Sequence, residues 1–242
     1  MAVKFLKKAF DTFMDLLCPS GVACLLCGKE IKEGSLCADC EKSLKVNSRN
    51  RCVKCSRPTV SIEDELCEQC KAMAHVYYDS CVAPLIYSGT ALALMRAFKY
   101  HDRIDIADYF VDFLEKEYYA LEKPDLIIPV PLWEKKLVDR VYSSADVLSE
   151  NLAKRTGAKL NKSICRKIKD TGTQTVLTPE ERAKNVKGCF EVTDKEAVKG
   201  KSILIVDDVF TTGATVSELA KVLKKKGASK VRVLCVAIAV TK

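Results

Sequence analysis

Apolar residues occur in two alternating patterns from about residue 81 onward. Four short apolar runs predict strands, at residues 80–89, 126–132, 202–208 and 230–240. Four stretches with apolar residues at helical spacing predict helices, at residues 90–100, 105–121, 143–157 and 215–228. Strands that alternate with helices indicate an α/β fold, in which a mostly parallel sheet is flanked by helices.

Local signals at the ends of these stretches support the boundaries. Pro124 stops the helix before it, and Gly157 follows a helix as a glycine C-cap often does. Thr178, Pro179 and Glu181 form a predicted capping box with proline at the first helical position. We therefore expect a further helix to begin at residue 179.

The first 20 residues show a helical apolar face without a long apolar run. The face consists of Phe5, Leu6, Phe10, Phe13, Met14 and Leu17. Asp11 and Asp15 interrupt the segment, which makes it a poor signal peptide, and no run in the chain approaches the roughly 20 apolar residues that span a bilayer. We predict a docking helix over residues 1–20, with attachment to a membrane surface as the alternative. The expected location is the cytoplasm, or the inner face of the membrane in that alternative.

Cysteine usage sets the first third of the chain apart. Eight of the 13 cysteines form four C-x-x-C pairs, Cys24/Cys27, Cys37/Cys40, Cys52/Cys55 and Cys67/Cys70. Pairs at this spacing predict a double zinc ribbon over residues 21–75, in which four thiolates meet around each of two zinc ions. Redox-active or oxidised cysteines are the alternative. Sequential pairing is the simplest arrangement, and a cross-braced one stays open.

Zinc in such a segment is expected to support folding, because about 50 residues bury little core. Four cysteines would fill every coordination position, which leaves no position for a catalytic water. The 242-residue chain, with 48% apolar residues, is long enough for a second and larger domain, predicted at residues 80–242.

Positive charge is concentrated in residues 154–187. The chain carries a net charge of +8, and this stretch supplies most of the excess. Such a segment suits a polyanion such as single-stranded DNA, and a solvated surface is the alternative. The stretch contains no aromatic residue, so it does not support stacking on bases.

The strand at 202–208 ends in two adjacent carboxylates, Asp207 and Asp208. A hydroxyl-rich turn follows at once and leads into the next helix; it consists of Thr211, Thr212, Gly213, Ala214 and Thr215. Ligands bind at the carboxyl ends of strands in open α/β sheets, and a helix N-terminus favours an anion. The turn should therefore hold a phosphate while the carboxylates accept hydrogen bonds from vicinal hydroxyls. A ribose 5-phosphate carries both groups.

The segment ILIVDDVFTTGAT resembles the phosphoribosyl-pyrophosphate loop of type I phosphoribosyltransferases. The chain as a whole is similar to the ComF/ComFC competence family, and other matching positions carry the resemblance. These are the cysteine pairs, Tyr87, Gly89, Phe98 to Tyr100, Pro129 to Leu132, Thr173, Gln174, Arg182, Asn185, Gly188 and Phe190. The chain departs from the family at residues 140–144, which read Arg-Val-Tyr-Ser-Ser where the family commonly has an Arg-Gly-Phe-Asn-Gln-like segment, so Arg140 is kept but the glycine and the amide side chains are missing.

The resemblance implies a ligand, Mg²⁺ with phosphoribosyl pyrophosphate. Asp207 and Asp208 would take the ribose hydroxyls, and residues 211–215 would hold the 5-phosphate. Lys99, Arg140 and Arg182 are implied contacts of the pyrophosphate, while Gln174 and Asn185 would shape a neighbouring loop. The departure at residues 140–144 puts efficient transfer of the phosphoribosyl group in question.

Two functions follow as alternatives. In the first, the resemblance implies a protein that handles single-stranded DNA during natural transformation, beside a helicase-like partner, and keeps a phosphoribosyl-pyrophosphate site. In the second, the chain is a phosphoribosyltransferase that acts on a small metabolite or nucleobase. Nothing in the sequence identifies the acceptor.

Overall fold

The chain forms two compact units in the computed structural model, Met1–Leu44 and Lys45–Lys242. The structure describes residues 22–47, 50–61, 63–72, 76–133, 141–172 and 178–240. The docking helix predicted at 1–20 lies outside these residues, as do Arg140, Thr173 and Gln174. None of the helices in the described ranges is long and apolar enough to cross a membrane.

The first unit contains a short hairpin and one helix. Strands β1 (Val22–Ala23) and β2 (Glu30–Ile31) pair antiparallel, and helix α2 covers Ala38–Lys42. The turn between the strands is closed by a hydrogen bond from the N–H of Gly28 to the carbonyl of Cys24, at 2.9 Å. Gly28 has a φ of +74°, a conformation in which glycine avoids the strain of a side chain. A tight turn with glycine in the left-handed conformation thus follows Cys27.

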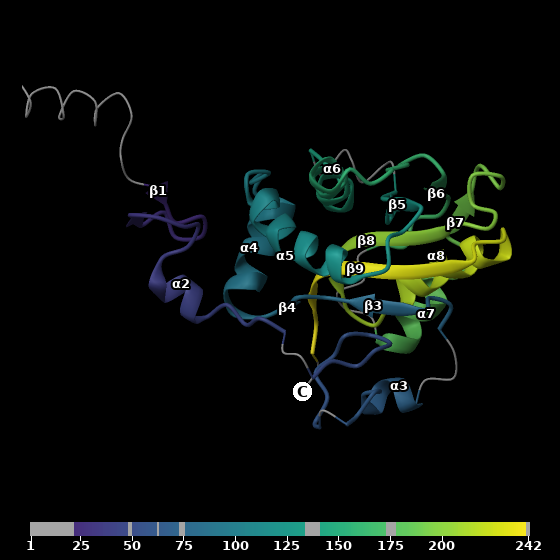
Figure 1. Ribbon diagram of the computed structural model, residues 1–242, viewed down its shortest axis with the longest axis horizontal. Coiled ribbons are helices and arrows are strands. Elements are labelled where there is room, and N and C mark those ends of the chain that lie inside the picture. Colours follow the sequence, from purple (N-terminus) through teal and green to yellow (C-terminus); the bar gives the residue numbers. More distant parts are fainter. Residues whose placement is uncertain are drawn as a thin grey trace, which may run out of the picture. The chain divides into compact units, whose positions relative to one another are not determined.

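The second unit is built on a five-stranded sheet (Figure 1). Its strands are β3 (Ser80–Val82), β4 (Leu85–Ile86), β5 (Leu126–Pro129), β8 (Ser202–Phe210) and β9 (Lys230–Ile238). The strand order is β3-β9-β8-β5, with β4 also paired to β9, and every pairing is parallel. The predicted α/β fold with a mostly parallel sheet is confirmed.

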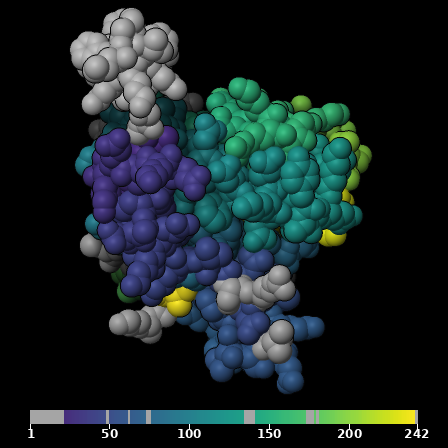
Figure 2. Space-filling view, turned by 60° about the vertical axis from the view of Figure 1, so that its left-hand side comes forward, coloured from purple at the N-terminus to yellow at the C-terminus, as the bar shows by residue number. Residues whose placement is uncertain are grey.

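Helices cover both faces of this sheet. The helices of this unit include α4 (Gly89–Tyr100), α5 (Ile106–Ala120), α6 (Ser144–Thr156), α7 (Pro179–Val186) and α8 (Ala214–Lys225); α5, α6 and α8 lie against the sheet, whereas α4 packs on α5 and α7 packs on α8. Helices α5 and α6 pack against each other and over β8 and β9, and α8 lies on the opposite face (Figure 1). On the surface, the teal residues around 100–125 and the green residues around 150 lie side by side (Figure 2). Because both faces are covered, β8 and β9 are buried along most of their length, as their apolar sequences require.

The predicted glycine C-cap of α6 and the predicted capping box of α7 are confirmed, and α6 also has an N-cap that was not predicted. Ser143 caps α6 by accepting a hydrogen bond from the N–H of Asp146, and Gly157 ends the helix with a φ of +66°. The capping box of α7 is formed by Thr178 and Glu181.

Two parts of the sheet region differ from the sequence expectation. The strand predicted at 80–89 is divided into β3 and β4, because Pro84 between them lacks the N–H that a continuous ladder needs. Helix α4 already begins at Gly89. An unpredicted antiparallel pair joins β6 (Cys165–Lys167), within the basic stretch, to β7 (Phe190–Val192), just beyond it. Both strands are too short to give a clear periodicity.

The second pair of C-x-x-C motifs packs with the sheet. Cys52 and Cys55 are buried and belong to the same apolar cluster as Tyr78, Cys81 and Phe210. Helix α3 (Glu68–Ala72) completes this segment, which lies at the bottom of the view in Figure 1. The cysteine-rich segment from 52 to 70 is therefore part of the second unit.

Candidate phosphate and carboxylate site

The two predicted carboxylates lie at the carboxyl end of β8. The strand is fully buried from Ile203 to Val206 and runs parallel to β5, whose Pro129 is the register partner of Val206. Asp207 is half-buried and Asp208 is buried. Adjacent residues of a strand point to opposite faces, so the two carboxylates have different surroundings.

Asp207 lines a small open pocket at the N-terminal end of α8. The other lining residues are Val209, Phe210, Thr211, Gly213, Ala214, Thr215 and Val216. The predicted turn and the first carboxylate are thus brought together. The structure confirms that the turn leads directly into a helix of 12 residues, whose first N–H groups have no partner within the helix.

Gly213 shapes this turn. It is the N-cap of α8 with a φ of +79°, and a Cβ at this position would lie 2.6 Å from the ring of Phe210 and 3.2 Å from the hydroxyl of Tyr78. Conformation and space both require glycine here. The hydroxyl of Thr212 accepts a hydrogen bond from the N–H of Ala214 at 3.3 Å, which fixes the entry into the helix.

Asp208 is held by two side chains that approach from other elements. Lys99, in the last turn of α4, places its Nζ 2.6 Å from Oδ1. The hydroxyl of Ser144, at the start of α6, donates to Oδ2. Tyr142 fixes the segment before Ser144, because its hydroxyl donates to the carbonyl of Phe98 and the two rings lie 5.4 Å apart. Lys99 was expected at the pyrophosphate, and the structure pairs it with Asp208.

The pKa values of the two carboxyls are driven apart. Burial raises the pKa of Asp207 to about 7, and the negative charge of Asp208 adds to this rise. Burial also opposes ionisation of Asp208, but the ammonium of Lys99 and the hydroxyl of Ser144 outweigh it and lower its pKa below the ordinary value. The same pair raises the pKa of Lys99. Near neutral pH, Asp208 is ionised while Asp207 exchanges between its two forms.

Two of the remaining predicted site residues, Arg182 and Asn185, lie on α7. Arg182 is on α7, a helix that packs against α8. Asn185, on the same helix, donates to the carbonyl of Thr171. Arg140 and Gln174 lie outside the described residues. Sequence reasoning missed Ser144 as a site residue, although it had noted the unusual serines at 143 and 144.

The eight paired cysteines form two groups with the sequential arrangement. Cys24, Cys27, Cys37 and Cys40 form the first cluster, and Cys52, Cys55, Cys67 and Cys70 form the second cluster. Within each cluster all four sulfurs lie within 4.8 Å of one another. Sulfurs at about 2.3 Å from a tetrahedral zinc ion are roughly 3.8 Å apart. The distances of 3.7 Å between Cys27 and Cys37 and 3.5 Å between Cys55 and Cys67 fit this geometry.

One cysteine in each cluster has a thiol pKa below the ordinary value. Burial disfavours the thiolate of Cys24, but backbone N–H groups of Cys27, Cys37 and Leu26 outweigh it and lower the pKa of Cys24 to about 6. In the same way the pKa of Cys52 is lowered to about 7. Thiolates with several N–H donors are the ligands that zinc knuckles use, so both clusters support zinc sites.

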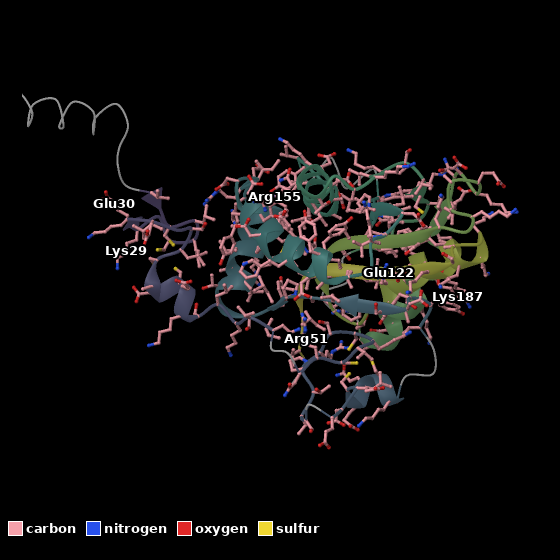
Figure 3. All side chains as sticks on the ribbon, viewed as in Figure 1. Lys29, Glu30, Arg51, Glu122, Arg155 and Lys187 are labelled. Carbon is pink, nitrogen blue, oxygen red and sulfur yellow. The ribbon has the colours of Figure 1, made fainter. Side chains whose placement is uncertain are left out.

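The basic stretch is dispersed and partly neutralised. Arg155 pairs with Asp112 at 2.7 Å, Arg166 pairs with Glu191 at 2.8 Å, and Lys162 pairs with Glu150. Arg155 and Lys187 lie far apart on the second unit (Figure 3). The described residues of 154–187 are therefore partly neutralised and do not form a single basic surface.

Comparison with known proteins agrees with both parts of the chain. Residues 143–241 match the family model of the phosphoribosyl transferase domain, and residues 13–71 match that of the double zinc ribbon domain. The chain is 30% identical over 219 residues to the DNA utilization protein YhgH of Escherichia coli strain K12, which covers 83% of this chain and 95% of the relative. It is 28% identical over 217 residues to competence protein F of Haemophilus influenzae, with 87% of each chain covered. A solved adenine phosphoribosyltransferase from Thermoanaerobacter pseudethanolicus is 19% identical, with a TM-score of 0.38, and covers 58% of this chain and 84% of that one.

The parallel sheet, the strand–turn–helix at the end of β8 and the cysteine clusters define a protein with a phosphoribosyltransferase-type domain and a double zinc ribbon. The chain belongs to the ComF family, together with the YhgH proteins and the competence proteins F and ComFC. The resemblance inferred from the sequence is confirmed.

Proposed function

We propose that the chain binds phosphoribosyl pyrophosphate with Mg²⁺ at the carboxyl end of β8. The observation that carries this proposal is the pocket that joins Asp207 to the turn at Gly213 and to the start of α8. A carboxylate and a helix N-terminus beside one small pocket suit a ligand with a hydroxyl-bearing part and an anionic part. A ribose 5-phosphate is such a ligand.

The two carboxylates have different roles in this proposal. Asp207 faces the pocket and accepts the ribose hydroxyls or the waters of the metal. Asp208 already accepts hydrogen bonds from Lys99 and Ser144, one on each of its two oxygens, and each oxygen keeps a second acceptor position. In this proposal Asp208 holds Lys99 at the edge of the site, where the remaining N–H groups of the ammonium donate to a pyrophosphate.

Calorimetry with Mg²⁺ and phosphoribosyl pyrophosphate tests the site. The wild-type protein should bind, and Asp207→Asn should weaken binding at least about tenfold, since it removes a charged acceptor. Asp125→Asn is the matched control, because the carboxylate of Asp125 accepts a hydrogen bond from the N–H of Ser202 at the other end of β8. No binding by the zinc-loaded wild-type protein would overturn the proposal.

We also propose that the chain acts in the handling of single-stranded DNA during DNA uptake. This proposal is supported by the chain's similarity to relatives that are named a DNA utilization protein and a competence protein. Binding to a single-stranded oligonucleotide should weaken steeply with salt, as it does when lysines and arginines release counterions.

Because several basic residues in 154–187 are paired with carboxylates, the DNA test uses exposed lysines that are not. Lys154, Lys159 and Lys169 are exposed, and within the described ranges none of them forms an ion pair. Their combined reversal to glutamate should weaken DNA binding more than reversal of Lys225 and Lys226, exposed lysines at the far end of α8. Equal losses in the two variants, per charge reversed, would show that only net charge matters.

Phosphoribosyl transfer to a small acceptor is the second candidate, and the match to the phosphoribosyl transferase domain favours it. Two serines of the segment 140–144, where the chain departs from the family, have structural roles. Ser143 caps α6, and Ser144 donates a hydrogen bond to Asp208. We therefore expect ligand binding to persist with slow or no transfer. Pyrophosphate release in a screen of nucleobases and amines would establish the transferase; a screen with no turnover, in a protein that binds the ligand, would favour a binding role.

A further inference from the structure

Arg57 connects the second cluster to the turn at the phosphate site. Its side chain is buried, with 8% of the residue exposed. One guanidinium nitrogen, Nη1, lies 3.5 Å from the sulfur of Cys55, and the other, Nη2, donates to the carbonyl of Thr211. The guanidinium also lies over the ring of Phe210, 5.7 Å from its centroid. One side chain thus contacts a candidate zinc ligand and two residues of the site.

The backbone that carries Arg57 is firmly held. Ser56 has a φ of +67°, an uncommon conformation for a residue with a side chain. Its hydroxyl accepts a hydrogen bond from the N–H of Ala83 at 3.0 Å, and its carbonyl accepts one from the amide of Asn47 at 2.7 Å. The carbonyl of Arg57 accepts one from the N–H of Cys52 at 2.7 Å. The position of the guanidinium is therefore set by the turn at residues 52–57, called the knuckle below, and by the buried residues Asn47 and Ala83 that hydrogen-bond to it.

A buried guanidinium stays charged and needs a negative or strongly polar partner. Among the described residues, Nε of Arg57 makes no hydrogen bond, so the two Nη groups make the contacts that compensate its charge. Zinc bound by four thiolates carries a net negative charge. A loaded second cluster therefore supplies the counter-charge of Arg57, and the guanidinium is then held in place to bind Thr211.

The bond to Thr211 fixes a donor of the turn. A peptide group is planar and trans, so its carbonyl and the following N–H point in opposite directions. When Arg57 holds the carbonyl of Thr211, the N–H of Thr212 is directed the other way. Phe210, on which the guanidinium stacks, is also the residue whose ring limits the space at Gly213. Arg57 thus holds both the backbone of the turn, at Thr211, and the ring of Phe210 that packs against it.

We propose that Arg57 is a positioning residue that couples the metal state of the second cluster to the order of the turn at residues 211–215. With zinc bound, the turn is held ready for a phosphate; without it, the turn loses order and affinity. Coupling of this kind is reciprocal, so a ligand at the turn must also affect the metal site. The ligand part of the proposal rests on the phosphoribosyl-pyrophosphate site proposed above, whereas the ordering of the turn does not.

Hydrogen exchange of the zinc-loaded full chain tests the ordering without any ligand. Arg57→Gln should increase amide exchange in peptides that cover residues 211–216, and Arg57→Lys should give a smaller increase, because an ammonium keeps the charge but lacks the planar fork. Lys54→Met is the matched control. Lys54 lies in the same C-x-x-C segment, and its ammonium donates to the carbonyls of Tyr78 and Asp79, at 2.7 and 3.3 Å, rather than to a carbonyl of the turn. Its exchange at 211–216 should match that of the wild type.

A second arm uses cobalt in place of zinc as a spectroscopic reporter. In a Cys37→Ser background, which removes the first cluster as a metal site, the visible bands report the second cluster. Phosphoribosyl pyrophosphate with Mg²⁺ should shift these bands in that background and with Lys54→Met, but not with Arg57→Gln. The affinity for the ligand should fall about tenfold or more with Arg57→Gln, the scale expected for a lost hydrogen bond to a charged donor.

The two proposals fail in different ways. A wild-type protein that binds no phosphoribosyl pyrophosphate refutes the ligand site, while increased exchange in Arg57→Gln alone still supports the coupling. Unchanged exchange at 211–216 in Arg57→Gln, with both zinc ions retained, would overturn the coupling. Equal increases in Arg57→Gln and Lys54→Met would also overturn it, because they would mark a general loosening of the knuckle.

Discussion

Replacing Asp207 with asparagine should stabilise the folded protein at neutral and alkaline pH. The pKa of Asp207 rises from 3.8 to about 7 on folding, mainly through burial. A shift of about three units corresponds to about 4 kcal/mol, and the partial exposure of the side chain reduces this to roughly 2–4 kcal/mol. Asparagine has no charge to bury, so the variant avoids this cost.

The pH dependence gives the sign of the effect. Because the folded-state pKa is raised, the favourable contribution of protonated Asp207 is complete below about pH 4 and is lost as the pH rises to about 7. The advantage of Asp207→Asn should therefore grow between pH 4 and 7 and then level off. Urea unfolding between pH 5.5 and 8.5, with zinc content checked at each pH, measures this difference.

Asp208→Asn is the control of opposite sign. The pKa of Asp208 is lowered by Lys99, so its ionised form stabilises the fold above its ordinary pKa. Its removal leaves the ammonium of Lys99 buried without its partner, which should cost about 3–5 kcal/mol at pH 8. The reasoning fails if both variants shift the unfolding midpoint in the same direction at pH 8. It also fails if the advantage of Asp207→Asn does not change with pH.

Three further predictions concern the turn, the serines and the metal sites. Gly213→Ala should cost about 2–4 kcal/mol and weaken phosphoribosyl-pyrophosphate binding, whereas Gly200→Ala, at a φ of +71° in open space, should cost only about 1–2 kcal/mol and leave binding unchanged in calorimetry. Ser144→Ala should cost about 1–3 kcal/mol and alter ligand affinity, while Ser143→Ala should cost about 1 kcal/mol through the lost cap and leave affinity unchanged. Elemental analysis should find two zinc ions per chain, one for each cluster, and a serine in place of one cysteine should remove one ion and spare the other.

The strand, the turn and the caps could be predicted because each depends on residues close together in sequence. The run from Ile203 to Asp208 reads as a buried strand that ends in charge, and the glycine at 213 marks the turn. The same holds for the sequential cysteine clusters, whose members lie within 20 residues of one another. Short-range patterns of this kind were sufficient to predict most of the helices and strands of the sheet region.

The contacts that decide the electrostatics of the site could not be predicted in this way. Ser144 is 64 positions from Asp208, Lys99 is 109 positions away, and Arg57 is 154 positions from Thr211. No periodicity links such residues, and only the packing of α4, α6 and the knuckle around the sheet brings them together. Lys99 was assigned to the pyrophosphate on its charge and its position in the family pattern, and neither reveals the carboxylate that it pairs with in the fold.

The position of β9 in the sheet has a consequence for the newly made chain. Among the strands of the sheet, β9 comes last in the sequence, yet it lies between β3 and β8 and also pairs with β4. On the ribosome, β8 therefore presents an open edge, and β3 and β4 await their partner, until residues 230–238 have emerged. Both cysteine clusters are complete much earlier, once residue 70 has emerged. During synthesis, metal capture can thus precede closure of the sheet, and a chain that stops before residue 230 would have both cysteine clusters but a β8 edge without its partner β9.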